Sequence, residues 1–210
     1  MLTKFTALAM GVLLSVSAAD MATLTRQAQS GDVAAQLDLA DEYYKRGNHA
    51  KAFEWTTKAA NQGFADAQFG LGVLYHNGHG VSQDYQKAVE WITKAANQGH
   101  AAAQTNLGLM YEQGKGVRQD YQKAFEWTTK AANQGYADAQ NNLGVMYDNG
   151  QGVRQDYQKA VEWYTKAAHQ GDAGAQYNLG GMYAKGHGVS QDYQKAFEWT
   201  TKAANQGFAD

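Results

Sequence analysis

Three histidines of this 210-residue chain have the residue type and spacing that come nearest to metal chemistry. His76 and His79 are close in sequence and His100 follows, and imidazoles that converge on one point can bind zinc. The combination does not recur in the related segments of the chain, where Glu112 and Asp148 take the position of His76. We therefore interpret these residues as loop histidines and predict no metal site.

Nucleophilic catalysis has no support in the sequence. The chain has no cysteine, which excludes a catalytic thiolate, thiolate metal ligands and disulfides. Ser82 and Ser190 lie near expected helix starts, where helix capping explains them. The glycine pairs in "GHGVS" and "GKGVR" lack the strand and the lysine of a phosphate-binding loop, so we interpret them as turns. The sequence predicts no catalytic residue and no cofactor.

The overall charge excludes one class of partner. The formal net charge is -2 at pH 7, with 18% charged and 44% hydrophobic residues. Proteins that bind nucleic acids neutralise phosphates with clustered lysine and arginine. This chain has no strongly basic field, so we predict that it does not bind nucleic acid.

The first 19 residues predict a secretory signal peptide. Lys4 gives a basic start, an apolar run extends from Phe5 to Val16, and small residues up to Ala19 provide a cleavage site. The run has about a dozen residues, short of the roughly 20 that span a membrane, so an uncleaved membrane anchor is the lesser alternative. We expect a periplasmic or secreted protein without a stable membrane span after cleavage.

The rest of the chain is an internal repeat with a period of 36 residues. The period appears in the tryptophans Trp91, Trp127, Trp163 and Trp199 and in the tyrosines Tyr75, Tyr111, Tyr147 and Tyr183. Such periods are typical of solenoids built from stacked units. We assign an N-terminal segment with a divergent first repeat to 20–60, four repeats to 61–96, 97–132, 133–168 and 169–204, and the start of an incomplete repeat to 205–210.

Each repeat should contain two helices. Gly78, in "NGHGV", can take the left-handed conformation that ends the first helix. Asp84 should cap the second helix, which ends at Gly99. Because a single helix pair buries little apolar surface, neighbouring repeats must stack to form a core. The sequence therefore predicts an all-α chain.

Positions that recur in every copy should form the core of this stack. On a helical wheel, Leu71 and Tyr75 share one face of the first helix, and Trp91 lies on the apolar side of the second. Gly72 should allow close approach of another helix. The predicted repeat core is Leu71, Tyr75, Trp91, Leu107, Tyr111, Trp127, Leu143, Tyr147, Trp163, Leu179, Tyr183 and Trp199.

The pattern "A-x-x-x-L-G-x-M-Y-x-x-G-x-G-V-x-Q-D-Y-x-K-A-x-E-W-x-x-K-A-A-x-Q-G", complete between Ala101 and Gly135, resembles the Sel-1-like repeat family, relatives of the tetratricopeptide repeats. The resemblance extends from Gln36 to the end of the chain. It implies a right-handed α/α superhelical solenoid that acts as an adaptor in protein assemblies, often at the bacterial envelope. Some exported members are cysteine-rich and have been described as penicillin-binding or β-lactamase-like, and this chain departs from them in having no cysteine.

The copies differ along one stripe of the first helix, at positions spaced i, i+4 and i+7 and at one neighbouring position. In tetratricopeptide-like stacks the first helices line the concave surface, so we predict that this stripe binds another protein. The alternative is that unconstrained surface positions have drifted. The stripe comprises Phe69, Val73, His76, Thr105, Asn106, Leu109, Glu112, Asn141, Asn142, Val145, Asp148, Tyr177 and Asn178.

These observations predict an exported scaffold that mediates protein–protein interaction. Two alternatives remain, a β-lactamase-like or penicillin-binding envelope protein and a carbohydrate-binding module that stacks sugars on Phe69 and Tyr177. The last second helix, 192–206, keeps the apolar arc that its predecessors should bury, including Tyr193 and Trp199. Either the chain is truncated there, or this face packs end to end with a second copy.

Overall fold

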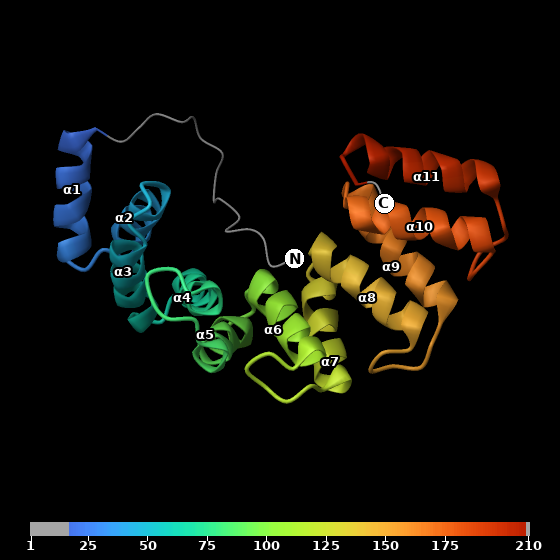
Figure 1. Cartoon of the computed structure of the whole chain (residues 1–210), viewed down its shortest axis with the longest axis horizontal. Coiled ribbons are helices and arrows are strands. Elements are labelled where there is room, and N and C mark those ends of the chain that lie inside the picture. Colours follow the sequence, from blue (N-terminus) through green and yellow to red (C-terminus); the bar gives the residue numbers. More distant parts are fainter. Residues whose placement is uncertain (1–16, 209–210) are drawn as a thin grey trace. The chain divides into compact units, whose positions relative to one another are not determined.

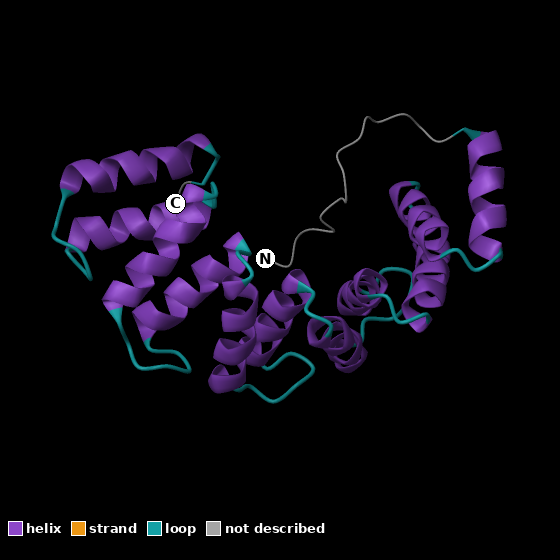
Figure 2. Cartoon of the chain, turned by 180° about the vertical axis from the view of Figure 1, so that it is seen from behind, coloured by secondary structure: helices purple, strands orange, loops and turns teal. Residues whose placement is uncertain are grey.

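Helices are the only regular secondary structure among residues 17–208, which the computed structural model describes (Figures 1 and 2). The helices are α1 (Ala18–Gln29), α2 (Val33–Lys45), α3 (His49–Asn61), α4 (Ala65–Asn77), α5 (Tyr85–Asn97), α6 (Ala101–Gln113), α7 (Tyr121–Asn133), α8 (Ala137–Asn149), α9 (Tyr157–His169), α10 (Ala173–Lys185) and α11 (Tyr193–Asn205). Within these residues, no helix has both the length and the apolar character needed to cross a bilayer. Positions 1–16 of the predicted signal peptide lie outside the described residues.

The chain divides into two compact units, and each is considered by itself. The first extends to Asn106 and includes Lys115–Val117, and the second holds Leu107–Gly114 and the chain from Arg118. In the first unit α2 packs on α3 and α4 on α5, and in the second α8 packs on α9 and α10 on α11. We call α2, α4, α6, α8 and α10 the first helices, and α3, α5, α7, α9 and α11 the second helices. The predicted all-α fold of two-helix repeats with a period of about 36 residues is confirmed.

Local signals place the ends of these helices as expected. The Asp84 side chain accepts a hydrogen bond from the backbone N–H of Lys87 and caps α5, which confirms the predicted cap. Gly78 ends α4 with φ 71°, in the left-handed region where glycine is favoured. The same two devices recur between α8 and α9 and between α10 and α11, so these connections have similar geometry, whereas α2 ends at Arg46 and Asn48 caps α3.

The core of each unit combines buried leucines with half-buried tryptophans. The recurring leucine of α4, α6, α8 and α10 is at most 1% exposed, at Leu71, Leu107, Leu143 and Leu179. The tryptophans Trp91, Trp127, Trp163 and Trp199, which we expected to be buried, are half-buried. A lysine amine lies over each of these rings, 3.8 Å from the ring centroid at Trp91 and 4.2 Å at Trp199. Because indole is large and its face attracts cations, one tryptophan can both contact the core and hold a surface lysine.

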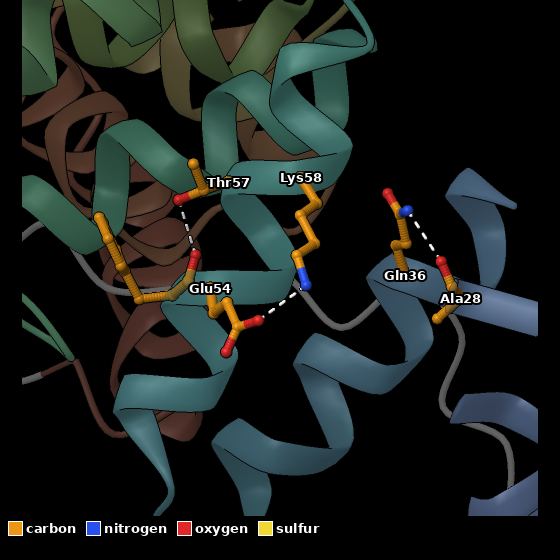
Figure 3. Close-up of polar contacts among 6 residues, drawn as sticks. Ala28, Gln36, Glu54, Thr57 and Lys58 are labelled. Carbon is orange, nitrogen blue, oxygen red and sulfur yellow. Dashed lines mark hydrogen bonds and ion pairs between the residues drawn. The ribbon is translucent and has the colours of Figure 1, made fainter. Parts of the chain in front are cut away.

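A buried glutamine connects each of the first helices α2, α6, α8 and α10 to the helix before it. Gln36 Nε2 of α2 donates to the carbonyl oxygen of Ala28 in α1 at 3.0 Å (Figure 3). Gln104, Gln140 and Gln176 make the same bond to the preceding second helix of their own units. These side chains are 5–6% exposed. Each bond therefore satisfies a buried amide with a buried carbonyl.

The oxygen of this glutamine is bonded by another glutamine, at the end of the second helix of the same repeat. Gln170 Nε2 donates to Gln140 Oε1 at 2.7 Å and to the carbonyl of Gly135 at 3.0 Å. The pairs Gln62–Gln36, Gln98–Gln68 and Gln206–Gln176 repeat this arrangement. We call these residues the junction glutamines. In α8 and α10 they connect the first helix to the second helices on both sides.

Glycine permits the close contact between the two helices of a repeat, as predicted at Gly72. A Cβ atom added there would lie 2.5 Å from Ile92 Cγ1. At Gly180 of α10 it would lie 2.7 Å from Thr200 Cγ2, whereas at Gly181 it would meet nothing within 4 Å. Gly180 is therefore required by packing and Gly181 is not.

These adjacent glycines give opposite predictions. Gly180→Ala should lower the free energy of unfolding by about 1–3 kcal/mol, because the new methyl group overlaps Thr200. Gly181→Ala should raise it by about 0.5–1 kcal/mol, because alanine favours the helix and has free space. Urea unfolding followed by circular dichroism measures both variants against the unchanged chain. If both substitutions change the free energy of unfolding in the same direction, the close contact between Gly180 and Thr200 is contradicted.

Candidate protein-binding site

The residues of the predicted stripe lie on α4, α6, α8 and α10, and two of them are buried. His76 is 8% exposed and Thr105 4%. The His76 ring meets the ring of Tyr85 edge-on, with centroids 5.0 Å apart, and Thr105 Oγ1 donates to the carbonyl of Ala101. These two side chains are therefore covered by the chain itself, unlike the exposed surface that we expected of the stripe. Helical spacing shows which residues share a face, but it does not show which neighbour covers that face.

Other members of the stripe are half-buried and hold neighbouring repeats together. In the first unit, the rings of Phe69 and His100 lie 4.7 Å apart. In the second unit, Asn178 Nδ2 donates to Asn141 Oδ1 at 3.0 Å, and Val145 packs against the hydrophobic cluster around Tyr164. Variation at these positions therefore also changes the contacts between repeats.

Three predicted residues of the second unit come together in an open groove of about 390 Å³ between α10 and α11, the two last helices in Figure 1. They are Asp148 of α8 and Tyr177 and Asn178 of α10. We call this feature the α10–α11 groove. Its full lining is Asp148, Tyr177, Asn178, Gly180, Gly181, Met182, Ala184, Lys185, Ala196, Phe197 and Thr200.

The groove lining includes small residues where earlier repeats have larger ones. Gly181 takes the place of Val145, and Ala184 takes the place of Asp148. A side chain at Gly181 would meet no atom within 4 Å at its Cβ. The sequence comparison contained these differences, but we did not predict a cavity or assign Gly181 and Ala184 to the site.

The walls of the groove are mainly apolar, with polar groups among them. Tyr177 is 37% exposed and Phe197 71% exposed. Asp148 accepts a hydrogen bond from the Tyr164 hydroxyl at 3.4 Å, and burial together with this carboxylate raises the pKa of Tyr164. Lys185 supplies a positive charge. Such a surface can bind an apolar segment and orient it by hydrogen bonds and ion pairs.

The three histidines of the metal hypothesis each have a separate structural role. His76 packs on Tyr85, and His79 Nδ1 lies 2.9 Å from the hydroxyl oxygen of Tyr44. His100 precedes α6, where its Nδ1 accepts a hydrogen bond from the backbone N–H of Ala103 at 3.1 Å. The His100 ring therefore caps a first helix.

Burial lowers the pKa of His100, and the carboxylate of Asp66, 3.2 Å from its Nε2, opposes this change. The fold thus favours the neutral ring, whose Nδ1 can accept the capping hydrogen bond. The stability that this preference contributes is complete above the ordinary pKa of 6.5. It is lost as the pH falls toward the lowered value.

Replacing His100 with asparagine should remove this pH dependence, because asparagine keeps an oxygen that can cap the helix but does not titrate. We expect the melting temperature of the unchanged protein to fall more steeply below pH 6.5 than that of His100→Asn. Thermal unfolding between about pH 5 and pH 8 measures the difference. Both proteins keep the other histidines. If their melting temperatures change with pH in the same way, His100 does not have the assigned role.

Comparisons with known proteins agree with this architecture. The Sel1 repeat family model matches residues 33–64, 65–100, 101–136, 137–172 and 173–208. The four repeats from residue 65 keep the 36-residue period found in the sequence, with boundaries shifted from 61 to 65, and the first repeat, 33–64, is shorter.

Two solved structures are similar over most of the chain. A Sel1 repeat protein from Oxalobacter formigenes is 33% identical with a TM-score of 0.79, over 91% of this chain and 84% of that one. The protein c5321, a protective antigen of uropathogenic Escherichia coli with an SLR fold, is 34% identical with a TM-score of 0.72, over 89% and 49%.

One curated relative carries the name of an enzyme. The putative beta-lactamase HcpE of Helicobacter pylori is 40% identical over 48 residues, 23% of this chain. The matched segment spans only 14% of that protein.

Proposed function

Because this chain belongs to the Sel1 repeat family, whose members generally serve as protein-interaction scaffolds, we propose that it binds another protein through the α10–α11 groove. The observation that carries the proposal is the position of Asp148, Tyr177 and Asn178. Asp148 and Tyr177 stand at positions that vary between repeats, and together with Asn178 they line one open groove on the second unit. The proposed function includes no bond-making step, and the enzymatic name of HcpE describes that protein.

Affinity would come from exposed aromatic rings on helices that are already ordered. Tyr177 and Phe197 flank the groove and present apolar surface to solvent. Aromatic residues of this kind often dominate the binding energy of protein interfaces. Because they lie on packed helices, little ordering entropy is lost on binding. Asp148 and Asn178 would supply polar contacts that orient the partner.

The proposal has two further parts, which are that other residues of the stripe also contact the partner and that the protein is exported. Asn106, Leu109, Glu112 and Asn142 are half-buried and offer further partial contact surface within their own units. The signal-like segment 1–19 supports a site of action in the periplasm or outside the cell. The alternative use of this surface is the end-to-end pairing of two copies through the exposed faces of Tyr193 and Phe197 on α11.

Site-specific photo-crosslinking in the native cell tests the proposal. A photoreactive phenylalanine analogue at Tyr177 keeps an aromatic ring at the groove, and the same analogue at Lys159 of α9 is the control on an exposed second-helix position. We expect a discrete adduct from position 177 alone, because only that site lines the groove.

Two other outcomes would contradict partner binding at the groove. One is no adduct at position 177, or the same adduct from both positions. The other is a covalent dimer of this chain as the single product from position 177, which would instead support pairing through α11.

A further inference from the structure

The loop that joins the two helices of a repeat rests on the second helix of the repeat before it. Gly80, in the loop after α4, lies so close to the backbone of His49, the first residue of α3, that an added Cβ atom would overlap the carbonyl oxygen. In the second unit Gly188 approaches the carbonyl oxygen of Tyr157, the first residue of α9, in the same way. The glycine therefore brings the residue before it next to the ring at the start of a helix.

In two of these contacts the ring at the helix start is a tyrosine. His187 stacks on Tyr157 with ring centroids 4.4 Å apart and an angle of 24° between the ring planes. In the first unit the amine of Lys115 lies 5.9 Å from the ring centroid of Tyr85, at the start of α5. The face of a tyrosine ring attracts a cation. Both contacts therefore accept a positive charge on the loop residue.

The contact between α3 and the loop after α4 is different, because both of its rings are imidazoles. His79 stacks on His49 with ring centroids 5.1 Å apart and an angle of 19° between the planes. Tyr44 of α2 lies against both, with its ring centroid 4.7 Å from that of His49 and its hydroxyl oxygen 2.9 Å from His79 Nδ1. We call the two imidazoles the His49–His79 stack. Since histidine gains a proton near neutral pH, both members of this stack can become cations.

The surroundings of the stack suit one added proton but not two. His79 Nδ1 faces the Tyr44 hydroxyl, whose oxygen can accept a hydrogen bond from a protonated ring. The Nδ1 atom of His49 is buried and has no hydrogen-bond partner within residues 17–208. A protonated imidazole donates from both of its nitrogens, so a charged His49 would leave a buried N–H group unpaired. It would also face a second cation across the stack.

The charged groups of the neighbouring elements are paired with one another. Asp66 forms an ion pair with His100, but within the described residues no carboxylate pairs with either ring of the stack. The other pairs on α2, on α3 and at the start of α5 are Lys45 with Asp41, Arg46 with Glu42, Lys58 with Glu54, Lys87 with Asp84, and Lys51 with the ring of Tyr43. On α4 the titratable ring of His76 meets Tyr85.

From these observations we infer that the His49–His79 stack is an acid-sensitive contact, which holds the loop of residues 78–84 on α3 near neutral pH and releases it in acid. On release both rings reach water and both can be protonated, whereas the packed stack takes up one proton at most. Release thus takes up a proton. The stability that the contact contributes is complete above about pH 6.5 and is lost as the pH falls below it.

The equivalent contact of the second unit should respond in the opposite direction. A protonated His187 keeps its place on Tyr157 and gains the attraction of the tyrosine face for a cation. Acid should therefore loosen the loop after α4 and leave the loop after α10 in place. The inference concerns the first unit and does not rest on the α10–α11 groove.

Hydrogen exchange of the full chain tests this difference. The backbone N–H of His79 bonds to the carbonyl of Leu74 and that of Asp84 to the carbonyl of Tyr75, so both amides report whether the loop is in place. Deuterium uptake is read by mass spectrometry and corrected for the direct effect of pH on exchange. From about pH 7.5 to pH 5.5 the protection of segment 78–84 should fall about tenfold, because release takes up one proton. Segment 186–192, which has equivalent bonds, should keep its protection.

The variant His49→Tyr gives the stack the tyrosine that later repeats have at this position. The loss of protection in acid should then disappear from segment 78–84, because a tyrosine face attracts a protonated His79. His187→Gln is the control, since it removes the histidine from the equivalent contact of the second unit. It should leave the acid response of segment 78–84 unchanged. Circular dichroism near neutral pH shows whether each variant keeps its helices.

Three results would overturn the inference. They are an equal loss of protection in the two loops, a segment 78–84 that stays protected in acid, and a folded His49→Tyr variant that still loses protection there. If His49→Tyr does not fold, the comparison of the two loops in the unchanged chain still decides the outcome.

Discussion

The pairing of a buried glutamine of the first helix with a glutamine at the end of the second helix is the interaction on which the arrangement of each unit depends. Gln140 donates to α7 with its nitrogen and accepts from Gln170 with its oxygen, so one amide connects three helices. An unsatisfied buried amide costs about 1–3 kcal/mol, which penalises any shift of the first helix. Because the same pairing recurs in both units, equivalent side chains take equivalent places in successive repeats, and the aromatic contacts recur in register.

This fixed frame explains how a binding surface arises by changing a few residues. Gly180 keeps α10 close to α11, and the pair Gln176–Gln206 fixes the end of α11 against the first helix. With the two walls held in place, the loss of side-chain volume at Gly181 and Ala184 leaves a groove rather than a collapsed contact. The junction glutamines thus hold the helices in place, and the residues at the variable positions determine the shape of the surface.

The features that the sequence predicted correctly have local causes. The period, the helical class, the Asp84 cap and the close approach at Gly72 follow from spacing, capping chemistry and the absence of a side chain. The burial of His76 and Thr105 could not be predicted, because it depends on which neighbouring helix covers their face. The junction glutamines were missed although they recur, since a recurring polar residue does not by itself indicate burial. The groove could not be predicted either, because it depends on how α10 and α11 are placed relative to each other.

The most direct test of this account is a double-mutant cycle on Gln176 and Gln206, with methionine as the apolar replacement of similar volume. Their amides lie 2.9 Å apart at the junction that holds the groove walls. The account predicts that the double variant is more stable than the sum of the single effects implies, by at least about 0.5 kcal/mol in the free energy of unfolding, because each single change removes the hydrogen bond between the two amides and leaves the other side chain with only its bond to the carbonyl of Ala168 or Gly171. Additivity of the two effects to within about 0.3 kcal/mol would contradict the account.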